Sequence, residues 1–265
     1  MTKVTTKKKL AVLGNGFLAG IIVGAYNKGL LEEYELTGIL GRTKEKTEAL
    51  AEKGGCRPCS TLEELLEDKP DYVAEAASVK AVQDYGMKIL SGGADMILLS
   101  IGALADETFY REISECAKEN GRKIHIASGA IGGFDVLRTI SLMGQAQTSF
   151  RTKKGPNSLS GTPLFEESLM TDKEEKQVFH GSAKEAISIL PTKVNVAIAA
   201  SLASSGPENV DMSIFSVPEM VGDDHKITAQ IPGVKAELDI YSSTSAIAGW
   251  SVVAVLKNLV SPVVF

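Results

Sequence analysis

A glycine-rich turn with the spacing that binds nucleotide phosphates spans residues 14–19, Gly-Asn-Gly-Phe-Leu-Ala. A short apolar run precedes it and an apolar helical pattern follows it, so it reads as a turn between a strand and a helix. Gly14 can take the positive φ that this turn needs, and Gly16 has no Cβ, so a pyrophosphate can approach the helix N-terminus. A purely structural turn is the alternative. The residues that we expect to bind a dinucleotide here are Gly14, Asn15, Gly16, Phe17 and Leu18.

A basic segment, Gly41-Arg42-Thr43-Lys44, follows the next expected strand at residues 34–40. A dinucleotide-binding fold often has an acidic residue about 20 residues past its glycines, where it binds the ribose hydroxyls. No carboxylate occurs here before Glu45, and Arg42 and Lys44 suit a 2′-phosphate. The sequence therefore favours NADP over NAD as the cofactor, with Arg42 and Thr43 as binding residues. A solvated basic turn is the alternative.

Three histidines could transfer protons. His125 lies inside an apolar strand and reads as a packed core residue, and His180 reads as a surface residue. His225 follows Gly222-Asp223-Asp224 at the head of an expected strand. An imidazole with a near-neutral pKa can move a proton while a hydride moves, and an adjacent aspartate could orient it. We expect His225 to be catalytic, with an ordinary loop histidine as the alternative.

Other reactive residues give weaker signals. Cys56 and Cys59 have C-x-x-C spacing, but no second pair completes a zinc site, so we expect plain thiols in a loop before a helix. No H-E-x-x-H motif or acidic cluster indicates a metal, and no G-x-S-x-G motif indicates a nucleophilic serine. The candidate partners for a substrate carboxylate are Arg151, Lys153, Lys154, Lys193 and the hydroxyl run 242–245.

Alternating strands and helices are expected to position these residues over the first half of the chain. The expected strands are 10–13, 34–40, 71–76, 94–99 and 123–127, and the expected helices are 17–31, 43–53, 79–90, 106–120 and 134–143. This alternation predicts βαβ units and a Rossmann-type, doubly wound parallel sheet. Ligands of such sheets bind at the carboxyl ends of the strands, where both glycine turns, 14–16 and 128–133, fall.

The second half of the chain has a different pattern. We expect a strand at 147–152, a polar excursion at 166–175, helices at 183–189 and 194–204, and alternating antiparallel strands at 210–217, 226–231 and 236–241. The last helix, 245–259, is apolar on more than one face, so it must be buried against the first domain or in a dimer interface. We place the domains at 1–130 and 131–242, with 243–265 packing back on the first.

Composition limits the classes of function. The 265 residues are 44% hydrophobic and carry a formal net charge of -5, which provides a core but no basic field for nucleic acid. No stretch is long and apolar enough to span a membrane. The basic start lacks the apolar region of a secretory signal, and an odd number of cysteines suits a reducing compartment. We expect a cytoplasmic protein that acts on a small molecule.

Segments along nearly the whole chain resemble the L-aspartate dehydrogenase family. They include AEAAS at 74–78, SIGALAD at 100–106, SGAIGGFD at 128–135, FHGSAKEA at 179–186 and VNVA at 194–197. The resemblance implies a Rossmann domain, an α+β catalytic and dimerisation domain, and a homodimer. It implies reversible oxidative deamination of L-aspartate to oxaloacetate and ammonia through iminoaspartate, with NAD or NADP, toward the biosynthesis of nicotinamide cofactors. Carried over by position, Ala130 and Asn195 would contact the nicotinamide end of the cofactor, and His225 would be catalytic. We also expect Ala76 and Ala77 to bind the cofactor.

Some residues depart from the family pattern around the substrate side. The family usually has Asn two residues before the histidine, where this chain has Asp223, and its Asp-Pro turn is replaced by Val217-Pro218-Glu219. Two alternatives stay open. One is an NADPH-dependent reductase or dehydrogenase of another amino acid, imine or oxo acid, and the other is a non-catalytic NADP-binding sensor.

Overall fold

The computed structural model describes residues 6–190 and 195–265, which divide into two compact units. The first unit runs to residue 127 and includes 246–265, and the second comprises residues 128–245. The sequence placed the two junctions after residues 130 and 242. Lys193 and the start of the expected helix at 194 lie outside the described residues.

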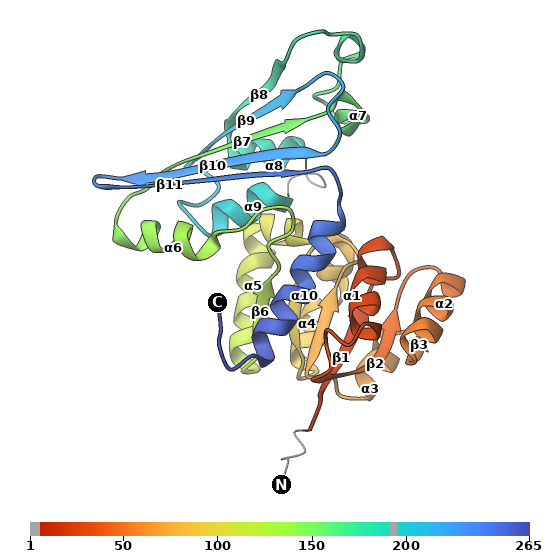
Figure 1. The fold of residues 1–265 in the computed structure, drawn as a ribbon. Coiled ribbons are helices and arrows are strands. Elements are labelled where there is room, and N and C mark those ends of the chain that lie inside the picture. The colour runs from red at the N-terminus through yellow and green to blue at the C-terminus, as the bar shows by residue number, and fades with distance from the viewer. Residues whose placement is uncertain (1–5, 191–194) are drawn as a thin grey trace. The chain divides into compact units, whose positions relative to one another are not determined.

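The first unit is built on a six-stranded sheet in which all paired strands are parallel (Figure 1). The strand order is β3-β2-β1-β4-β5-β6, the order of a dinucleotide-binding Rossmann fold. The strands are β1 (Lys8–Leu13), β2 (Tyr34–Leu40), β3 (Arg57–Cys59), β4 (Tyr72–Glu75), β5 (Asp95–Leu98) and β6 (Ile124–Ile126). Because β3 pairs with β2, Cys59 lies on an edge strand, and its expected place in a loop was wrong.

The crossovers of this sheet are helical. The helices of the unit are α1 (Phe17–Asn27), α2 (Lys44–Gly54), α3 (Leu62–Glu67), α4 (Val79–Ser91), the 3₁₀ helix η1 (Ile101–Ala105), α5 (Glu107–Glu119) and α10 (Ala246–Val260). Helix α1 ends four residues before the expected Leu31, because Gly29 has a φ of 74°, which terminates the helix. Helix α10 packs on α1, where Gly249 leaves room for Ile21. The apolar last helix is therefore buried against this unit.

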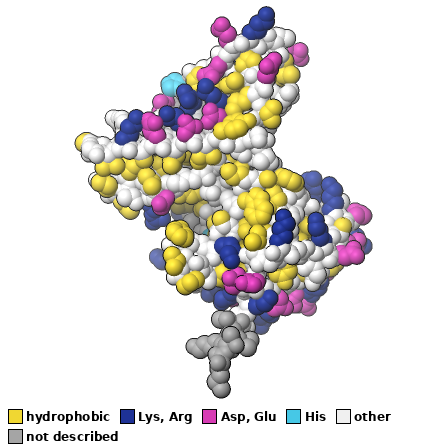
Figure 2. Space-filling view, viewed as in Figure 1, with side chains coloured by type: hydrophobic (Ala, Val, Ile, Leu, Met, Phe, Trp, Pro, Cys, Tyr) yellow, Lys and Arg dark blue, Asp and Glu magenta, His cyan; other side chains and the backbone are white. Residues whose placement is uncertain are grey.

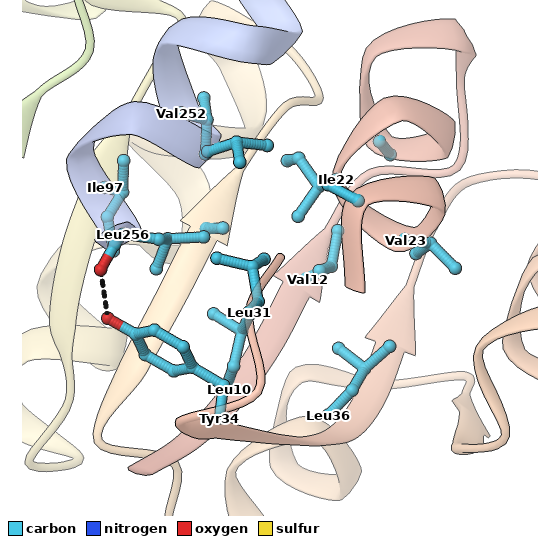
Figure 3. Packing of buried hydrophobic residues seen from close by; sticks show 14 of the residues in the cluster. Leu10, Val12, Ile22, Val23, Leu31, Tyr34, Leu36, Ile97, Val252 and Leu256 are labelled. Atoms are coloured by element: carbon cyan, nitrogen blue, oxygen red, sulfur yellow. Dashed lines mark hydrogen bonds between the residues drawn. The ribbon is translucent and has the colours of Figure 1, made fainter. Parts of the chain in front are cut away.

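The core of the first unit joins β1, α1, β2 and α10 (Figure 3). Leu10, Ile22 and Leu256 are fully buried in it. Tyr34 is also fully buried, and its hydroxyl donates a hydrogen bond to the backbone oxygen of Leu256 at 2.7 Å. A buried phenol needs such a partner, so this bond helps to join the C-terminal helix to the start of β2.

The second unit contains a five-stranded mixed sheet in the order β11-β10-β7-β9-β8. Its elements are α6 (Phe134–Met143), β7 (Gln147–Lys154), α7 (Pro156–Leu159), η2 (Glu167–Met170), β8 (Lys176–Ser182), α8 (Ala183–Ile189), α9 (Asn195–Leu202), β9 (Val210–Ser216), β10 (Asp223–Ile231) and β11 (Val234–Ser242). The expected strands β9, β10 and β11 alternate in direction, but β7 lies between β9 and β10 and pairs in parallel with β9. Strand β8 was not expected.

The two faces of this sheet differ in character. Along β7, the buried Thr148, Phe150 and Thr152 alternate with the exposed Ser149 and Arg151. The buried face packs against helices of the same unit, including α6 and α8. In Figure 2, Lys, Arg, Asp and Glu side chains gather on the part of the surface where Figure 1 draws strands of this sheet. The alternation therefore aims every second side chain of β7 and β10 into the interior of the unit.

None of the helices that the structure describes combines the length and the hydropathy needed to cross a membrane.

We predict that Tyr34→Phe lowers the free energy of unfolding by about 1 kcal/mol, since it removes one buried hydrogen bond and little else. Urea denaturation followed by circular dichroism measures this change. Tyr110→Phe is the matched control, because Tyr110 lies in the same unit with a side chain that is 44% exposed. Equal stability of the two variants would contradict a role for the Tyr34 hydroxyl.

Candidate active site

The glycine turn at the carboxyl end of β1 has the geometry of a phosphate site. Gly14 has a φ of 132°, and a Cβ there would collide with the carbonyl oxygen of Ala76. Gly16 caps α1, and a Cβ there would meet no atom within 4 Å. The first turn of α1 has no side-chain cap and no acidic residue, so its N–H groups can receive an anion. The turn therefore fits the pyrophosphate of a dinucleotide.

A cavity of about 660 Å³ opens beside this turn. Its walls include the glycine turn, the loop after β2 and the loop after β4, and the residues most relevant to a cofactor are Gly14, Asn15, Gly16, Arg42, Thr43, Lys46, Ala76, Ala77 and Ser78. Lys46 lines the cavity, whereas Lys44 is not among the lining residues and has a side chain that is 77% exposed. Lys46 lies one helical turn after Arg42, in the helix that follows β2. In the cavity wall beside Arg42, Lys46 therefore takes the place that the sequence suggested for Lys44.

Two of the residues expected to bind the cofactor have side chains that do not line this cavity. Phe17 and Leu18 begin α1 but are not among the residues that line the cavity. The side chain of Phe17 is 65% exposed, and Leu18 packs against the core of the first unit. Their backbone N–H groups, rather than their side chains, lie in the first turn of the helix that faces the cavity.

The side chain of Asn15 holds the glycine turn to the loop after β2. Its Nδ2 donates hydrogen bonds to the backbone oxygen of Thr43 at 2.8 Å and to Oγ1 of Thr47 at 2.9 Å. A Cβ on residue 41 would collide with the side chain of Asn15, so glycine fits at this position. The position of Arg42 and Thr43 relative to the glycine turn therefore depends on Asn15.

His225 lies in the second unit as the third residue of β10, and its side chain is buried. Its Nδ1 is 2.9 Å from Oγ1 of Thr152, its neighbour across the strand pair on β7. The ring also packs at 5.6 Å from the ring of Phe150. Nε2 has no hydrogen-bond partner among the described residues, so this nitrogen is the one that can serve a ligand.

A second cavity, of about 400 Å³, contains His225. It is lined by Ala130, Lys154, Ser158, Asn195, Val196, Asp223 and His225. Nζ of Lys154 lies 2.7 Å from Oδ1 of Asp223, and the lysine side chain is only 12% exposed. The cavity therefore brings together an imidazole, an ion pair and two polar side chains within one unit.

The surroundings of His225 keep its imidazole neutral. Burial, and after it the Lys154 cation, lower the pKa of His225 from 6.5 to about 4, while the Asp223 carboxylate acts in the opposite direction. A histidine with this pKa is uncharged at neutral pH. Its free nitrogen can therefore accept a proton without first losing one.

The two units match two family models. The model described as the C-terminal part of aspartate dehydrogenase matches residues 135–259, and that of the homoserine dehydrogenase NAD binding domain matches residues 14–127. The chain is 36% identical over 264 residues to an L-aspartate dehydrogenase of Methanococcus maripaludis (strain C6), which covers 96% of this chain and 98% of that protein. The chain belongs to the aspartate dehydrogenase family. The resemblance expected from the sequence is thereby confirmed.

Further relatives of the aspartate dehydrogenase family agree with this assignment. An L-aspartate dehydrogenase of Methanosarcina barkeri is 32% identical over 267 residues, covering 96% of this chain and 98% of the relative. The crystal structure of aspartate dehydrogenase from Thermotoga maritima has a TM-score of 0.73 at 26% identity and covers 97% of this chain and 99% of that chain. The expected fold class is confirmed, and the chain is a dehydrogenase whose first unit binds a nicotinamide cofactor.

The remaining histidines and the cysteines of this aspartate dehydrogenase family member lie apart from the two cavities. His125 on β6 has Nε2 at 3.5 Å from Oδ2 of Asp95, and His180 on β8 is exposed. Burial is the larger cause, and the neighbouring Cys59 the smaller one, of a Cys56 pKa raised to about 11. The thiol of Cys56 therefore stays protonated. No group of three or more metal-ligating side chains occurs within residues 6–190 and 195–265.

The basic residues of β7 that were expected to bind a substrate carboxylate lie on different faces of the second sheet. Lys154 lines the His225 cavity, whereas Lys153 pairs with Glu175 at 2.5 Å and Arg151 is exposed. Thr152 was not anticipated as a neighbour of His225. Its contact arises from the register of β7 with β10, for which the sequence carries no local signal.

We predict that Lys154→Met raises the pKa of His225 from about 4 toward 6.5, because it removes a cation and leaves Asp223 in place. An NMR titration of the histidine ring protons measures the shift. Lys153→Met is the matched control, since Lys153 pairs with Glu175 and not with a group in the cavity. A His225 pKa that does not move in Lys154→Met would contradict the electrostatic role of this lysine.

Proposed function

We propose that the chain is an L-aspartate dehydrogenase that interconverts L-aspartate with oxaloacetate and ammonia through iminoaspartate. The single observation that supports this most is the His225 cavity, where a neutral buried imidazole lies beside a lysine with a side chain only 12% exposed, in a member of the aspartate dehydrogenase family. We further expect a homodimer and a place toward nicotinamide cofactor biosynthesis, as the family resemblance implies.

The cofactor of this proposal is NADP in preference to NAD. Its phosphates are held by the backbone of the glycine turn and the first residues of α1, and its 2′-phosphate by Arg42, with Lys46 beside it. The residues assigned to the cofactor are Gly14, Asn15, Gly16, Phe17, Leu18, Arg42, Thr43, Ala76, Ala77, Ala130 and Asn195. Ala130 and Asn195 are assigned to its nicotinamide end because they line the cavity that contains His225.

His225 carries the proton transfers of the proposed reaction. A bound nicotinamide would supply the acceptor for the hydride on Cα of L-aspartate, and the hydride donor in the reverse direction. Neutral Nε2 of His225 takes a proton from the substrate amine, or from the water that attacks the imine. Thr152 holds Nδ1 and so keeps the ring in one orientation. Lys154 binds a substrate carboxylate.

One observation favours the alternative of a dehydrogenase for another amino acid, imine or oxo acid. Asp223, at the position where the family usually has Asn, pairs with Lys154 at 2.7 Å. This carboxylate offsets the lysine charge that a second substrate carboxylate would need. A scan of oxo acids with and without a second carboxylate distinguishes the two substrate classes.

We predict ammonium-dependent oxidation of NADPH when oxaloacetate is the substrate, and a loss of at least about 100-fold in kcat/KM in His225→Ala, because the base is removed. The absorbance of NADPH measures both, with oxaloacetate alone as the blank. NADPH binding without any oxidation, by this or other oxo acids, would instead favour a non-catalytic sensor.

His180→Ala is the matched control for this assay. His180 is also a histidine on the second sheet, but it is exposed and lies near Asp211 and Ser213. We expect its kcat/KM to stay within about twofold of that of the unmodified enzyme, as for surface substitutions in general. Near-normal turnover of His225→Ala, with cofactor binding unchanged, would contradict the catalytic role.

For the cofactor preference, we predict that Arg42→Ala raises the KM for NADPH about tenfold and barely changes that for NADH, since only NADPH carries the 2′-phosphate. Initial rates at varied cofactor concentration measure the two values. Lys44→Ala is the control, because this exposed lysine is not among the residues that line the cavity. An equal change in the KM values for NADPH and NADH would mean that Arg42 does not bind the 2′-phosphate.

A further inference from the structure

Glu75, the last residue of β4, is a buried carboxylate that the proposed reaction does not use. Its exposed fraction is 0%, and no cationic side chain pairs with it among the described residues. Burial raises the pKa of Glu75, while hydrogen bonds from Ser100, Ala77 and Leu99 act against that rise. Burying a carboxylate costs free energy unless its oxygens are hydrogen-bonded, so the donors around Glu75 decide what it can do.

Four donors converge on this carboxylate. Oε1 accepts from the N–H of Ala77 at 2.7 Å and from the hydroxyl of Ser100 at 2.8 Å. Oε2 accepts from the N–H of Leu99 at 3.1 Å and from the N–H of Ser100 at 2.8 Å. Glu75 therefore joins the backbone that follows β4 to the backbone that follows β5, at the sheet edge where ligands of this fold bind.

One of these donors belongs to the wall of the cofactor cavity. Ala77 lines that cavity together with Ala76 and Gly14. The N–H of Ala76 donates to the backbone oxygen of Leu13 at 2.8 Å, and the Ala76 carbonyl fills the space that a Cβ on Gly14 would need. A displacement of the Ala76–Ala77 backbone would thus press on the glycine turn.

We propose that Glu75 is a positioning residue for the nicotinamide cofactor, which acts by holding the N–H of Ala77, and with it the wall of the cofactor cavity, at a fixed distance from the glycine turn. The carboxylate contacts neither cofactor nor substrate. Its effect is on cofactor affinity and not on the chemical step. The proposal concerns cofactor binding alone, so it stands apart from the identity of the substrate.

Glu75→Gln tests this role selectively. The amide nitrogen cannot replace Oε2, because that oxygen faces two backbone N–H groups that can only donate. It can replace Oε1, since the Ser100 hydroxyl can turn and accept a hydrogen bond. The Gln side chain in that orientation keeps the bonds to Leu99 and Ser100 and loses the bond to Ala77.

We expect Glu75→Gln to raise the Kd for NADPH and for NADH about tenfold, measured by cofactor fluorescence below the melting temperature of the variant. The exchange of the Ala77 amide proton should become faster. We expect kcat at saturating cofactor to stay within about twofold of the unmodified value, because the catalytic groups are untouched.

Ser100→Ala is the matched control, because it removes one hydroxyl donor and leaves the three backbone bonds. Its Kd for NADPH should change less than about threefold. If Glu75→Gln fails to fold, Glu75→Asp decides: it keeps the charge but cannot reach all four donors, and it should also weaken NADPH binding. A lower melting temperature with an unchanged Kd, or an equal loss of affinity in Ser100→Ala, would overturn the proposal.

Discussion

The cofactor edge of the first unit depends on a backbone contact between Gly14 and Ala76. Only a glycine with a φ of 132° fits at the end of β1, because the carbonyl of Ala76 occupies the place of a side chain. This contact brings the end of β4 against the glycine turn, while Asn15 joins the other side of the turn to the loop after β2. Three loops are thus fixed relative to one another by one close approach and a few hydrogen bonds.

The parallel sheet was largely predictable because its signals are local. Strand β2 has the predicted bounds of Tyr34–Leu40, since apolar residues alternate with polar ones at its start and an apolar pair ends it before Gly41. Strand β3 has three residues, one of them Pro58, and so carries no pattern of its own; it forms because β2 offers a partner. Lys46 was overlooked for a related reason. Its place in the cavity follows from the rotation of α2 and not from its distance along the chain to the glycines.

The second unit was less predictable because its pairings join residues far apart in sequence. His225 was expected at the head of a strand, in a polar segment, yet β10 begins at Asp223 and continues between β7 and β11. The register that places His225 opposite Thr152 and Asp223 opposite Lys154 is a property of the pair of strands. Neither segment alone specifies it, since a shift by one residue would turn every side chain to the other face.

Glu75 and His225 are both buried and ionisable, yet their surroundings suit them to different roles. Glu75 accepts hydrogen bonds from four donors and pairs with no cationic side chain in the described part of the chain, so its surroundings favour a fixed acceptor. Burial, and after it a lysine whose charge is only partly offset by Asp223, lower the pKa of His225, so its surroundings favour the neutral base. A group that must hold backbone in place needs its hydrogen bonds saturated, whereas a group that must move a proton needs one nitrogen left open. This difference in saturation, rather than burial itself, distinguishes the positioning role proposed for Glu75 from the catalytic role proposed for His225.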